Sequence, residues 1–135
     1  MSERVIAAAR AWIGTPYAHQ ASCRGAGADC LGLLRGVWRE VHGAEPWRLP
    51  AYTPDWGEDD DALERALRRW LWPSAGEAPG QVVLFRMREG RAAKHLGLIS
   101  GAATFIHAQE RHGVVEVPLS LPWRRRIAAR FRFPD

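Results

Sequence analysis

One cysteine of the chain stands where its thiol could act as a nucleophile. Cys30 follows Asp29, a residue type that favours the N-cap of a helix, and the apolar residues after it recur at helical spacing as far as Val41. The sequence therefore predicts a helix that begins at Cys30 and is closed by Gly43. A helix N-terminus and a neighbouring imidazole lower the pKa of a thiol, which makes it a stronger nucleophile. Cys23 lies in a glycine-bearing loop with no helix behind it, which favours a structural role.

Two histidines provide a candidate general base, without which Cys30 would be interpreted as a small buried apolar residue. His95 and His107 both lie inside predicted strands, among apolar neighbours. We expect His95 to take the thiol proton and His107 to orient His95 through its other ring nitrogen. Backbone N–H groups at the start of the Cys30 helix could bind the oxyanion, so the trio predicts nucleophilic acyl transfer. The remaining histidines, which fall in loops or at a helix end and are typical of solvated side chains, are His19, His42 and His112.

This trio requires a particular pairing of the two histidine strands. A two-residue loop at 101–102 would pair Leu96 with His107 and leave the imidazoles on opposite faces of the sheet. A three-residue loop would pair Gly97 with His107 and leave His95 diagonal to it, roughly 7–8 Å away and within side-chain reach. Catalysis by both histidines therefore predicts the odd-numbered loop or a β-bulge.

The elements that must position these residues follow from hydrophobic periodicity. Helical spacing predicts helices over residues 2–13, from residue 30 to Gly43, and from the acidic run 58–61 to about Leu71. Between Ala44 and Trp56, prolines alternate with aromatic residues, which indicates an extended surface connection. After Pro73 the period becomes that of strands, which we expect over residues 81–87, 94–100, 104–109, 114–117 and 127–133. Helices followed by an antiparallel meander predict an α+β fold with the helices packed on one face of the sheet.

Length and composition bound the classes of protein. The chain has 135 residues, 47% of them hydrophobic and 25% charged, which is typical of one globular domain over residues 1–135. The net charge of +4 arises in residues 111–135, with six arginines and two acids, because residues 1–110 hold thirteen basic and thirteen acidic side chains. The sequence shows no signal peptide and no membrane span, so we expect synthesis in the cytoplasm and no membrane insertion. Two cysteines are too few for a disulfide scaffold.

Several short motifs, in order along the chain, resemble one family. Residues 29–34, Asp-Cys-Leu-Gly-Leu-Leu, resemble the Asp-Cys-Ser-Gly-Leu-Val signature of the NlpC/P60 cysteine peptidases, and residues 14–17, Gly-Thr-Pro-Tyr, resemble their upstream Gly-x-Pro-Tyr. Residues 79–85 are similar to the strand entry of the family, and the segments around His95 and His107 look like its histidine strand and third-residue strand. Leu31 stands where the family has Ser, and Gln81 stands where it has Asp.

The resemblance implies a papain-like α+β core and hydrolysis of peptide bonds in bacterial peptidoglycan, commonly the D-glutamyl to diaminopimelyl bond. It makes Cys30, His95 and His107 the expected catalytic residues. It also implies that Tyr17 faces the thiolate and helps to bind substrate or the oxyanion, and we assign Asp29 to the same substrate- or oxyanion-binding role. No metal and no cofactor are expected.

A narrower resemblance concerns residues 35–40, 45–46 and 52–56. These segments look like the phage-type subgroup found in the tail modules of phages and gene transfer agents. This implies phage-like tail or baseplate proteins as partners. It also fits the expected synthesis without a signal peptide, because the particle would deliver the enzyme to the periplasm or cell wall of the target bacterium.

Three alternatives stay open. The same trio could serve an amidase or an acyltransferase. Cys23, Cys30, His95 and His107 could hold a structural zinc ion, although a cysteine spacing of seven residues does not match that of zinc fingers. The basic run 124–126 could belong to a structural tail protein or a nucleic-acid-binding one, but such clusters are usually solvated, and we expect no nucleic-acid partner. We expect this arginine-rich end to meet the anionic wall or an acidic surface of a tail protein.

Overall fold

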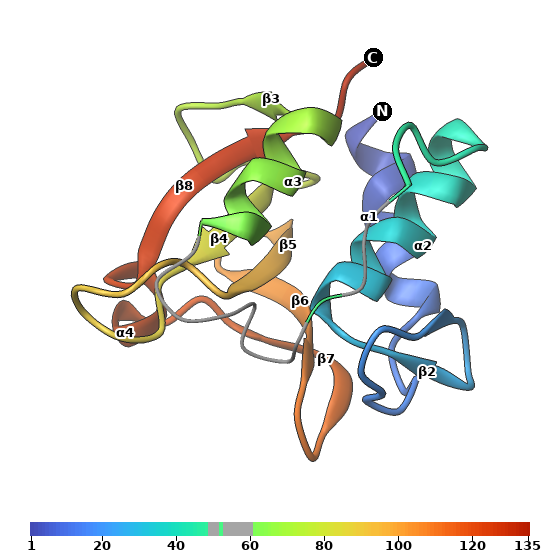
Figure 1. Cartoon of the computed structure of the whole chain (residues 1–135), viewed down its shortest axis with the longest axis horizontal. Helices are drawn as coiled ribbons and strands as arrows, with labels where there is room; N and C mark the ends of the chain where they lie inside the picture. The colour runs from blue at the N-terminus through green and yellow to red at the C-terminus, as the bar shows by residue number, and fades with distance from the viewer. Residues whose placement is uncertain (49–51, 53–60) are drawn as a thin grey trace.

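The computed structural model describes residues 1–48, 52 and 61–135. It contains the helices α1 (Ser2–Ala11), α2 (Cys30–His42) and α3 (Ala62–Trp70), and the short helix α4 (Leu121–Arg124). In Figure 1, α1 and α2 lie side by side, and α3 lies over the strand β8 (Ile127–Arg132). The three long helices are therefore those that the periodicity predicted. Most of the predicted proline and aromatic connection, and the acidic run apart from Asp61, lie outside the described residues.

One antiparallel sheet follows the helices. Besides β8 it contains β3 (Trp72–Pro73), β4 (Val82–Phe85), β5 (His95–Gly101), β6 (Thr104–Gln109) and β7 (Gly113–Pro118), in the order β3-β8-β4-β5-β6-β7. The strands β4 to β7 form the predicted meander, and the α+β prediction is confirmed. The last strand returns to the other edge of β4, where it also pairs with β3. The structure also has elements that the periodicity did not predict, namely β3 and a small hairpin of β1 (Ser22–Cys23) and β2 (Gly27–Ala28) within the predicted loop.

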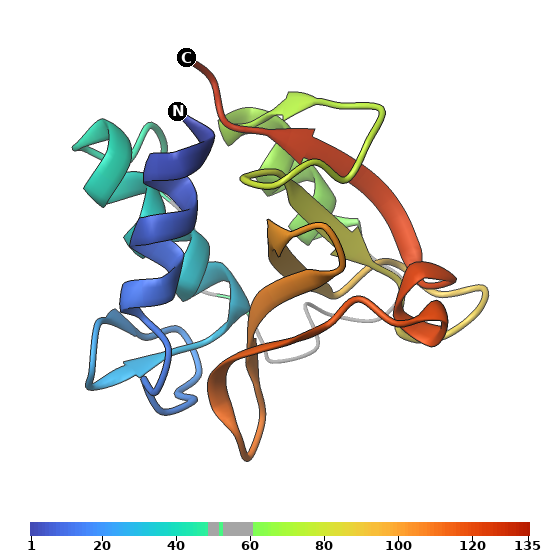
Figure 2. The ribbon, with the colours of Figure 1, turned by 180° about the vertical axis from the view of Figure 1, so that it is seen from behind.

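The two faces of the sheet are covered differently. Side chains such as Leu96, Leu98 and Ile106 point toward α1, α2 and α3 and form the main core with them. Their strand neighbours point the other way, where Phe85 and Phe105 form a smaller cluster that is closed by Leu119 and the segment around α4. This division follows from the period of two along a strand. Seen from behind in Figure 2, the hairpin of β6 and β7 projects beyond the rest of the sheet.

The arginine-rich end is partly engaged with the fold itself. Arg124 and Arg130 form ion pairs with Glu77, at 3.3 and 3.1 Å. Arg126 lies over the ring of Trp123, with 5.6 Å between its guanidinium carbon and the ring centroid. Exposed ion pairs of this kind add little to stability. Some of the arginines behind the positive net charge are therefore engaged in contacts within the chain.

None of the helices described here is long and apolar enough to cross a membrane.

A glycine permits the close packing of α1 against α2. A Cβ atom built on Gly36 would lie 1.9 Å from Cζ2 of Trp12, a buried residue directly after α1. The contact sets the spacing of the two helices, and Cys30 is the first residue of α2.

We predict that Gly36→Ala lowers the free energy of unfolding by about 1–3 kcal/mol, because the methyl group must displace the indole of Trp12. In a helix without this contact the same substitution would be stabilising. Urea denaturation measures the change. Gly76→Ala is the matched control, because a Cβ atom there meets nothing within 4 Å. Equal stability of the two variants would contradict the prediction.

Candidate active site

A β-bulge brings the two histidines to the same face of the sheet. Leu98 pairs with Ile106 and Ile99 with Phe105, but the next pair is Gly101 with Thr104, so the residue between, Ser100, is unpaired. The same register continued toward the start of β5 puts Gly97 opposite His107 and leaves His95 diagonal to it. The sequence analysis required an odd-numbered loop or a bulge, and the structure has the bulge.

The bulge is held by contacts on both sides. The Ser100 hydroxyl lies 2.9 Å from the Thr104 hydroxyl across the turn. The Ser100 carbonyl accepts a hydrogen bond from the Arg10 guanidinium of α1 at 3.3 Å, and Arg10 also pairs with Glu116 of β7 at 3.2 Å. The register that sets the histidines is therefore tied to a helix far away in the sequence.

The two imidazoles contact each other directly. His95 Nε2 and His107 Nδ1 lie 2.6 Å apart, so one of these nitrogens donates its proton to the other. This leaves Nδ1 of His95 as the ring nitrogen that could accept a proton from a thiol. It can do so only if the His95 proton sits on Nε2, which then donates to His107 and places the His107 proton on its own Nε2. That atom is buried and has no hydrogen-bond partner among the described residues.

Burial keeps both imidazoles neutral. The pKa of His95 lies well below the ordinary value because the ring is desolvated and because His107 is close. The pKa of His107 is also lowered, first by burial and then by His112 at the tip of the β6–β7 hairpin. A neutral imidazole is the form that can take a proton from a thiol.

Cys30 is the first residue of α2, as predicted, and its side chain is buried. Backbone N–H groups of Leu96, Leu31 and Cys30 itself favour the thiolate, and the Leu96 group comes from β5 next to His95. The thiol and the histidine pair thus meet where the start of α2 approaches the start of β5. The loop before α2 holds this end in place, because Val114 of β7 exchanges backbone hydrogen bonds with Gly14 and Thr15.

The predicted lowering of the thiol pKa is wrong, because the pKa of Cys30 is raised. Burial and the neighbouring Asp29 carboxylate raise the pKa of Cys30 to about 12, and the amide groups only oppose this in part. The helix N-terminus is present, but desolvation of the thiolate outweighs it. The resting pair is therefore a neutral thiol and a neutral imidazole, and the thiolate forms only when its proton is transferred.

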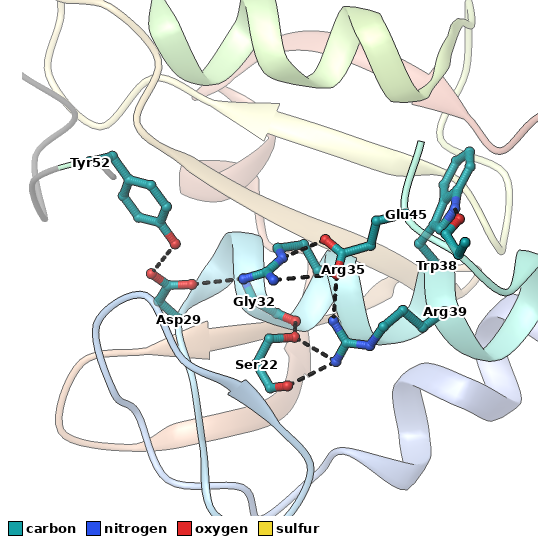
Figure 3. Close-up of polar contacts among 9 residues, drawn as sticks. Ser22, Asp29, Gly32, Arg35, Trp38, Arg39, Glu45 and Tyr52 are labelled. Atoms are coloured by element: carbon teal, nitrogen blue, oxygen red, sulfur yellow. Dashed lines mark hydrogen bonds and ion pairs between the residues drawn. The ribbon is translucent and has the colours of Figure 1, made fainter. Parts of the chain in front are cut away.

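The Asp29 carboxylate organises the residues around the thiol, as Figure 3 shows in part. One oxygen accepts a hydrogen bond from the Gly32 amide at 2.7 Å and caps α2. The other accepts from the Tyr52 hydroxyl at 2.6 Å and from the Gln20 amide at 2.7 Å. Gln20 has a φ of +62°, a conformation that L-residues rarely adopt, and this hydrogen bond helps to hold it there. Asp29 therefore joins the helix, the preceding loop and Tyr52.

A second polar cluster lies along the middle and last turn of α2 (Figure 3). Glu45 accepts hydrogen bonds from Arg35 at 2.7 Å and from Arg39 at 3.2 Å. Arg39 also donates to the backbone oxygen and the hydroxyl of Ser22 in β1, at 2.8 and 2.9 Å. The Ser22 hydroxyl in turn donates to the Gly32 carbonyl at 2.6 Å. Charge-assisted bonds of this kind are stronger than neutral ones, so they fasten the β1–β2 hairpin to α2.

Tyr17 keeps its phenolic proton. Burial, together with the negative charge that Cys30 and Asp29 can carry, raises the pKa of Tyr17 to about 12. The residue forms an isolated parallel bridge with Ala28, two positions before Cys30. A protonated phenol beside the thiol can donate a hydrogen bond to an oxygen that becomes negative.

These residues line a single pocket of about 620 Å³, a size typical of small-molecule sites. Cys30, His95 and His107 share it with Tyr17 and Asp29, the five residues predicted for the site. The further lining side chains, which sequence reasoning did not place there, are His19, Tyr52, Met87, Lys94, Ala108, Gln109, Glu110, Arg111, His112 and Trp123. Most of them come from loops, which lack the hydrophobic periodicity that predicts where a side chain points. His19 and His112, for which the sequence predicts solvated side chains, both line the pocket.

The zinc alternative finds no support in the arrangement of its four residues. Cys23 is exposed in β1, whereas Cys30 is buried in the pocket. Over residues 1–48, 52 and 61–135, no three His, Cys, Asp or Glu side chains are grouped so that they could hold a metal ion. Leu31 stands where the resemblance places a serine after the cysteine, and its side chain is buried in the main core. Gln81 accepts a hydrogen bond from the Ala78 amide at the entry of β4, away from the trio.

A cysteine at a helix N-terminus and a histidine on a facing strand, oriented by a third residue, form the arrangement of a cysteine peptidase. A sequence profile of the NlpC/P60 family matches residues 14–131, and the chain belongs to this family of cysteine peptidases. The family suggested by the short motifs is thus confirmed.

Two curated relatives support this membership. The chain is 30% identical over 116 residues to the murein DD-endopeptidase MepS/murein LD-carboxypeptidase of Escherichia coli, which covers 85% of this chain and 54% of that protein. It is 28% identical over 132 residues to the gamma-DL-glutamyl hydrolase of Bacillus subtilis, which covers 97% of this chain and 29% of that protein. The chain thus spans about half of the first relative and less than a third of the second.

Solved structures share the fold. A NlpC/P60 family protein from Bacillus cereus superposes with a TM-score of 0.71 at 18% identity, over 98% of this chain and 40% of that one. The NlpC/p60 domain of the peptidoglycan hydrolase SagA gives a TM-score of 0.65 at 22% identity, over 100% of this chain and 99% of that one. At these identities the likeness concerns the fold.

We predict that Tyr52→Phe lowers the free energy of unfolding by about 1–3 kcal/mol, because it removes a hydrogen bond to a buried carboxylate. Chemical denaturation measures the loss. Tyr17→Phe is the matched control, since no hydrogen bond of its hydroxyl contributes to the folded structure described here, and its stability should stay near that of the parent protein. An undiminished stability of Tyr52→Phe would show that Asp29 does not depend on this donor.

A second prediction concerns acid. Both imidazoles have pKa values below the ordinary value of about 6.5 in the folded state, so below that pH the unfolded chain binds protons that the folded chain does not. Stability is therefore full above about pH 6.5 and falls as the pH decreases toward the lowered values. The melting temperature should drop more between pH 7 and pH 5 in the parent protein than in His107→Gln, which lacks one of the two groups. Equal drops would contradict the assignment.

Proposed function

We propose that this protein is a thiol endopeptidase that cleaves stem peptides of bacterial peptidoglycan, with Cys30 as nucleophile, His95 as general base and acid, and His107 as the residue that orients His95. The observation that carries the proposal is the 2.6 Å contact between His95 Nε2 and His107 Nδ1 in a pocket that also contains the Cys30 thiol. It leaves one histidine nitrogen for the thiol and fixes the ring through the other.

The reaction begins with transfer of the thiol proton to Nδ1 of His95. The sulfur forms a bond to the carbonyl carbon of the scissile amide, and the carbonyl oxygen becomes negative. His95 then gives the proton to the leaving nitrogen, the C–N bond breaks, and a thioester remains on Cys30. Water, deprotonated by His95, attacks the thioester and releases the carboxylic acid and the thiol. The raised pKa of Cys30 makes proton transfer to His95 part of the first step rather than a state that exists beforehand.

Donors for the oxyanion come from the backbone and from Tyr17. The N–H groups of Cys30 and Leu31 lie in the first turn of α2, where the helix dipole favours negative charge. Tyr17 remains protonated at neutral pH, because its pKa is raised to about 12, and its hydroxyl can donate as the charge develops. Asp29 lines the pocket, but its carboxylate accepts hydrogen bonds from Gly32, Gln20 and Tyr52, so it acts by positioning the start of α2.

The proposed scissile bond is the D-glutamyl to diaminopimelyl link. Support for this bond comes from the relative named a gamma-DL-glutamyl hydrolase, whereas the relative named a murein DD-endopeptidase/LD-carboxypeptidase supports peptide hydrolysis in murein without this specificity. Stem peptides carry free carboxylates, and the pocket offers the cationic side chains of Lys94 and Arg111 at its rim. An amidase or acyltransferase reaction at the same trio is the competing assignment, and the products distinguish them.

A role in a phage-like tail completes the proposal. Residues 35–40 and 45–46 resemble the phage-type subgroup, and within them Arg35, Arg39 and Glu45 form the cluster that fastens the β1–β2 hairpin to α2. A tail component would be assembled in the cytoplasm and would act in the periplasm or cell wall of the target bacterium, with tail or baseplate proteins as partners.

Replacement of the nucleophile tests the activity. Cys30→Ala should reduce the release of muropeptides from purified peptidoglycan by about 10³-fold or more, because no nucleophile remains. Cys23→Ala is the matched control, since this cysteine is exposed in β1 outside the pocket, and it should hydrolyse at the parent rate. Cleavage by Cys30→Ala at a comparable rate would falsify the assignment.

Mass spectrometry of the digest identifies the bond. A new amine on diaminopimelate and a new carboxyl on D-glutamate are expected. Release of intact stem peptides from the glycan would establish an amidase, and products with a new acyl acceptor would establish an acyltransferase.

Quantitative proteomics of purified particles tests the tail role. The protein should be enriched together with tail proteins, and its absence from the particles would refute the tail role.

A further inference from the structure

A box of aromatic rings surrounds the two histidines on the side of the sheet away from the long helices. Phe85 stacks against His95, with ring centroids 6.0 Å apart, and Phe105 lies 4.7 Å from His107. Trp123 touches both imidazoles, at 6.0 Å from His95 and 5.3 Å from His107. Its ring also lies 4.9 Å from Phe85 and 5.2 Å from Phe105, so it completes the box.

Trp123 differs from the two phenylalanines in where it lies. Phe85 and Phe105 are fully buried, whereas Trp123 is half-buried and lines the pocket together with the histidines. Of the three rings, it is therefore the one that both contacts the imidazoles and lines the pocket beside them. Its aromatic neighbours are fixed by β4 and β6, whereas Trp123 comes from α4, far along the chain.

The segment that carries Trp123 is anchored on both sides. Before α4, the Leu119 amide donates to the Ala103 carbonyl at 2.8 Å, and the Leu119 side chain is buried in the smaller core. After α4, the Arg126 carbonyl accepts from the Arg86 amide at 2.7 Å, while the Arg126 guanidinium lies over the indole. These contacts hold the indole of Trp123 against the histidine pair. Arg126 thereby links the arginine-rich end to the site.

We propose that Trp123 is a positioning residue for catalysis: its indole fixes the orientation of the His95–His107 pair and excludes pocket water from it. The proposal deepens the proposed function, because it concerns the same general base. The indole holds the ring of His95 so that Nε2 stays on His107 and Nδ1 stays available. It also contributes to the burial that keeps both imidazoles neutral.

Other titratable and charged groups face the same pocket and must be distinguished from this effect. They are Tyr17, His19, Asp29 and Cys30 in and after the loop before α2, Tyr52, Lys94 before β5, Glu110, Arg111 and His112 at the tip of the β6–β7 hairpin, and Arg126 over the indole itself. Of these, His112 acts on His107 and lowers its pKa. A substitution of Trp123 leaves all of them in place, so a change in the titration of the pair reports the loss of shielding by the indole.

The test is a pH titration of Trp123→Ala in two readouts. Imidazole NMR signals of His95 and His107 should titrate about one pH unit or more higher than in the parent protein, because water reaches the rings. The acid limb of kcat/KM on a soluble muropeptide should move to higher pH by the same amount. At neutral pH, kcat should fall roughly 10- to 100-fold while KM changes less, since orientation and not substrate binding is lost. Trp123→Phe, which keeps an aromatic ring, should restore most of the parent behaviour.

Trp72→Ala is the matched control. Trp72 is exposed in β3, its ring lies against Arg132, and it is not part of the pocket, so both readouts should match the parent protein. If Trp123→Ala fails to fold, Trp123→Leu keeps apolar volume without the ring and carries the same expectations. An unchanged NMR titration, or a raised KM with unchanged kcat, would overturn the proposal. The NMR readout needs no activity, so failure to hydrolyse peptidoglycan would overturn the proposed function without deciding the role of Trp123.

Discussion

A single unpaired residue in β5 determines whether this fold can have a site at all. Side chains along a strand alternate between faces, so a register shift of one residue between β5 and β6 would carry His95 and His107 to opposite faces. Ser100 supplies that shift, and Arg10 of α1 holds its carbonyl. The helical layer is thus coupled to the catalytic register through one guanidinium. Gly36 permits the packing of α1 against α2, and α2 carries Cys30 at the pocket that the histidines also line.

Asp29 reveals a conflict between building the site and activating it. Its carboxylate caps α2, orders the preceding loop and binds Tyr52, so the position of Cys30 depends on it. The same negative charge opposes ionisation of the neighbouring thiol. Burial also lowers the pKa of both imidazoles, so it disfavours the imidazolium as well as the thiolate, and the structure holds all three groups in their neutral forms.

The features that could be predicted from the sequence are those that depend on residues close together in the chain. Asp29 marked the start of α2, alternation put both histidines in strands, and short motifs identified the family. The choice between an odd-numbered loop and a bulge could not be made, because both have the same apolar pattern and the bulge depends on Arg10, ninety residues away. Trp123 gave no periodic signal, since α4 is a single turn. The thiol pKa was misjudged because a helix N-terminus is visible in sequence, whereas burial among distant elements is not.

The strand order has a consequence for how the protein is made. β4 lies between β5 and β8, so one of its edges stays unpaired during synthesis until residues 127–132 have left the ribosome. The turn that carries Trp123 belongs to the same late segment. A nascent chain can already contain the cysteine and both histidines and still lack a closed sheet around them. The sheet can therefore close only after residues 127–132 have been synthesised, later than Cys30, His95 and His107.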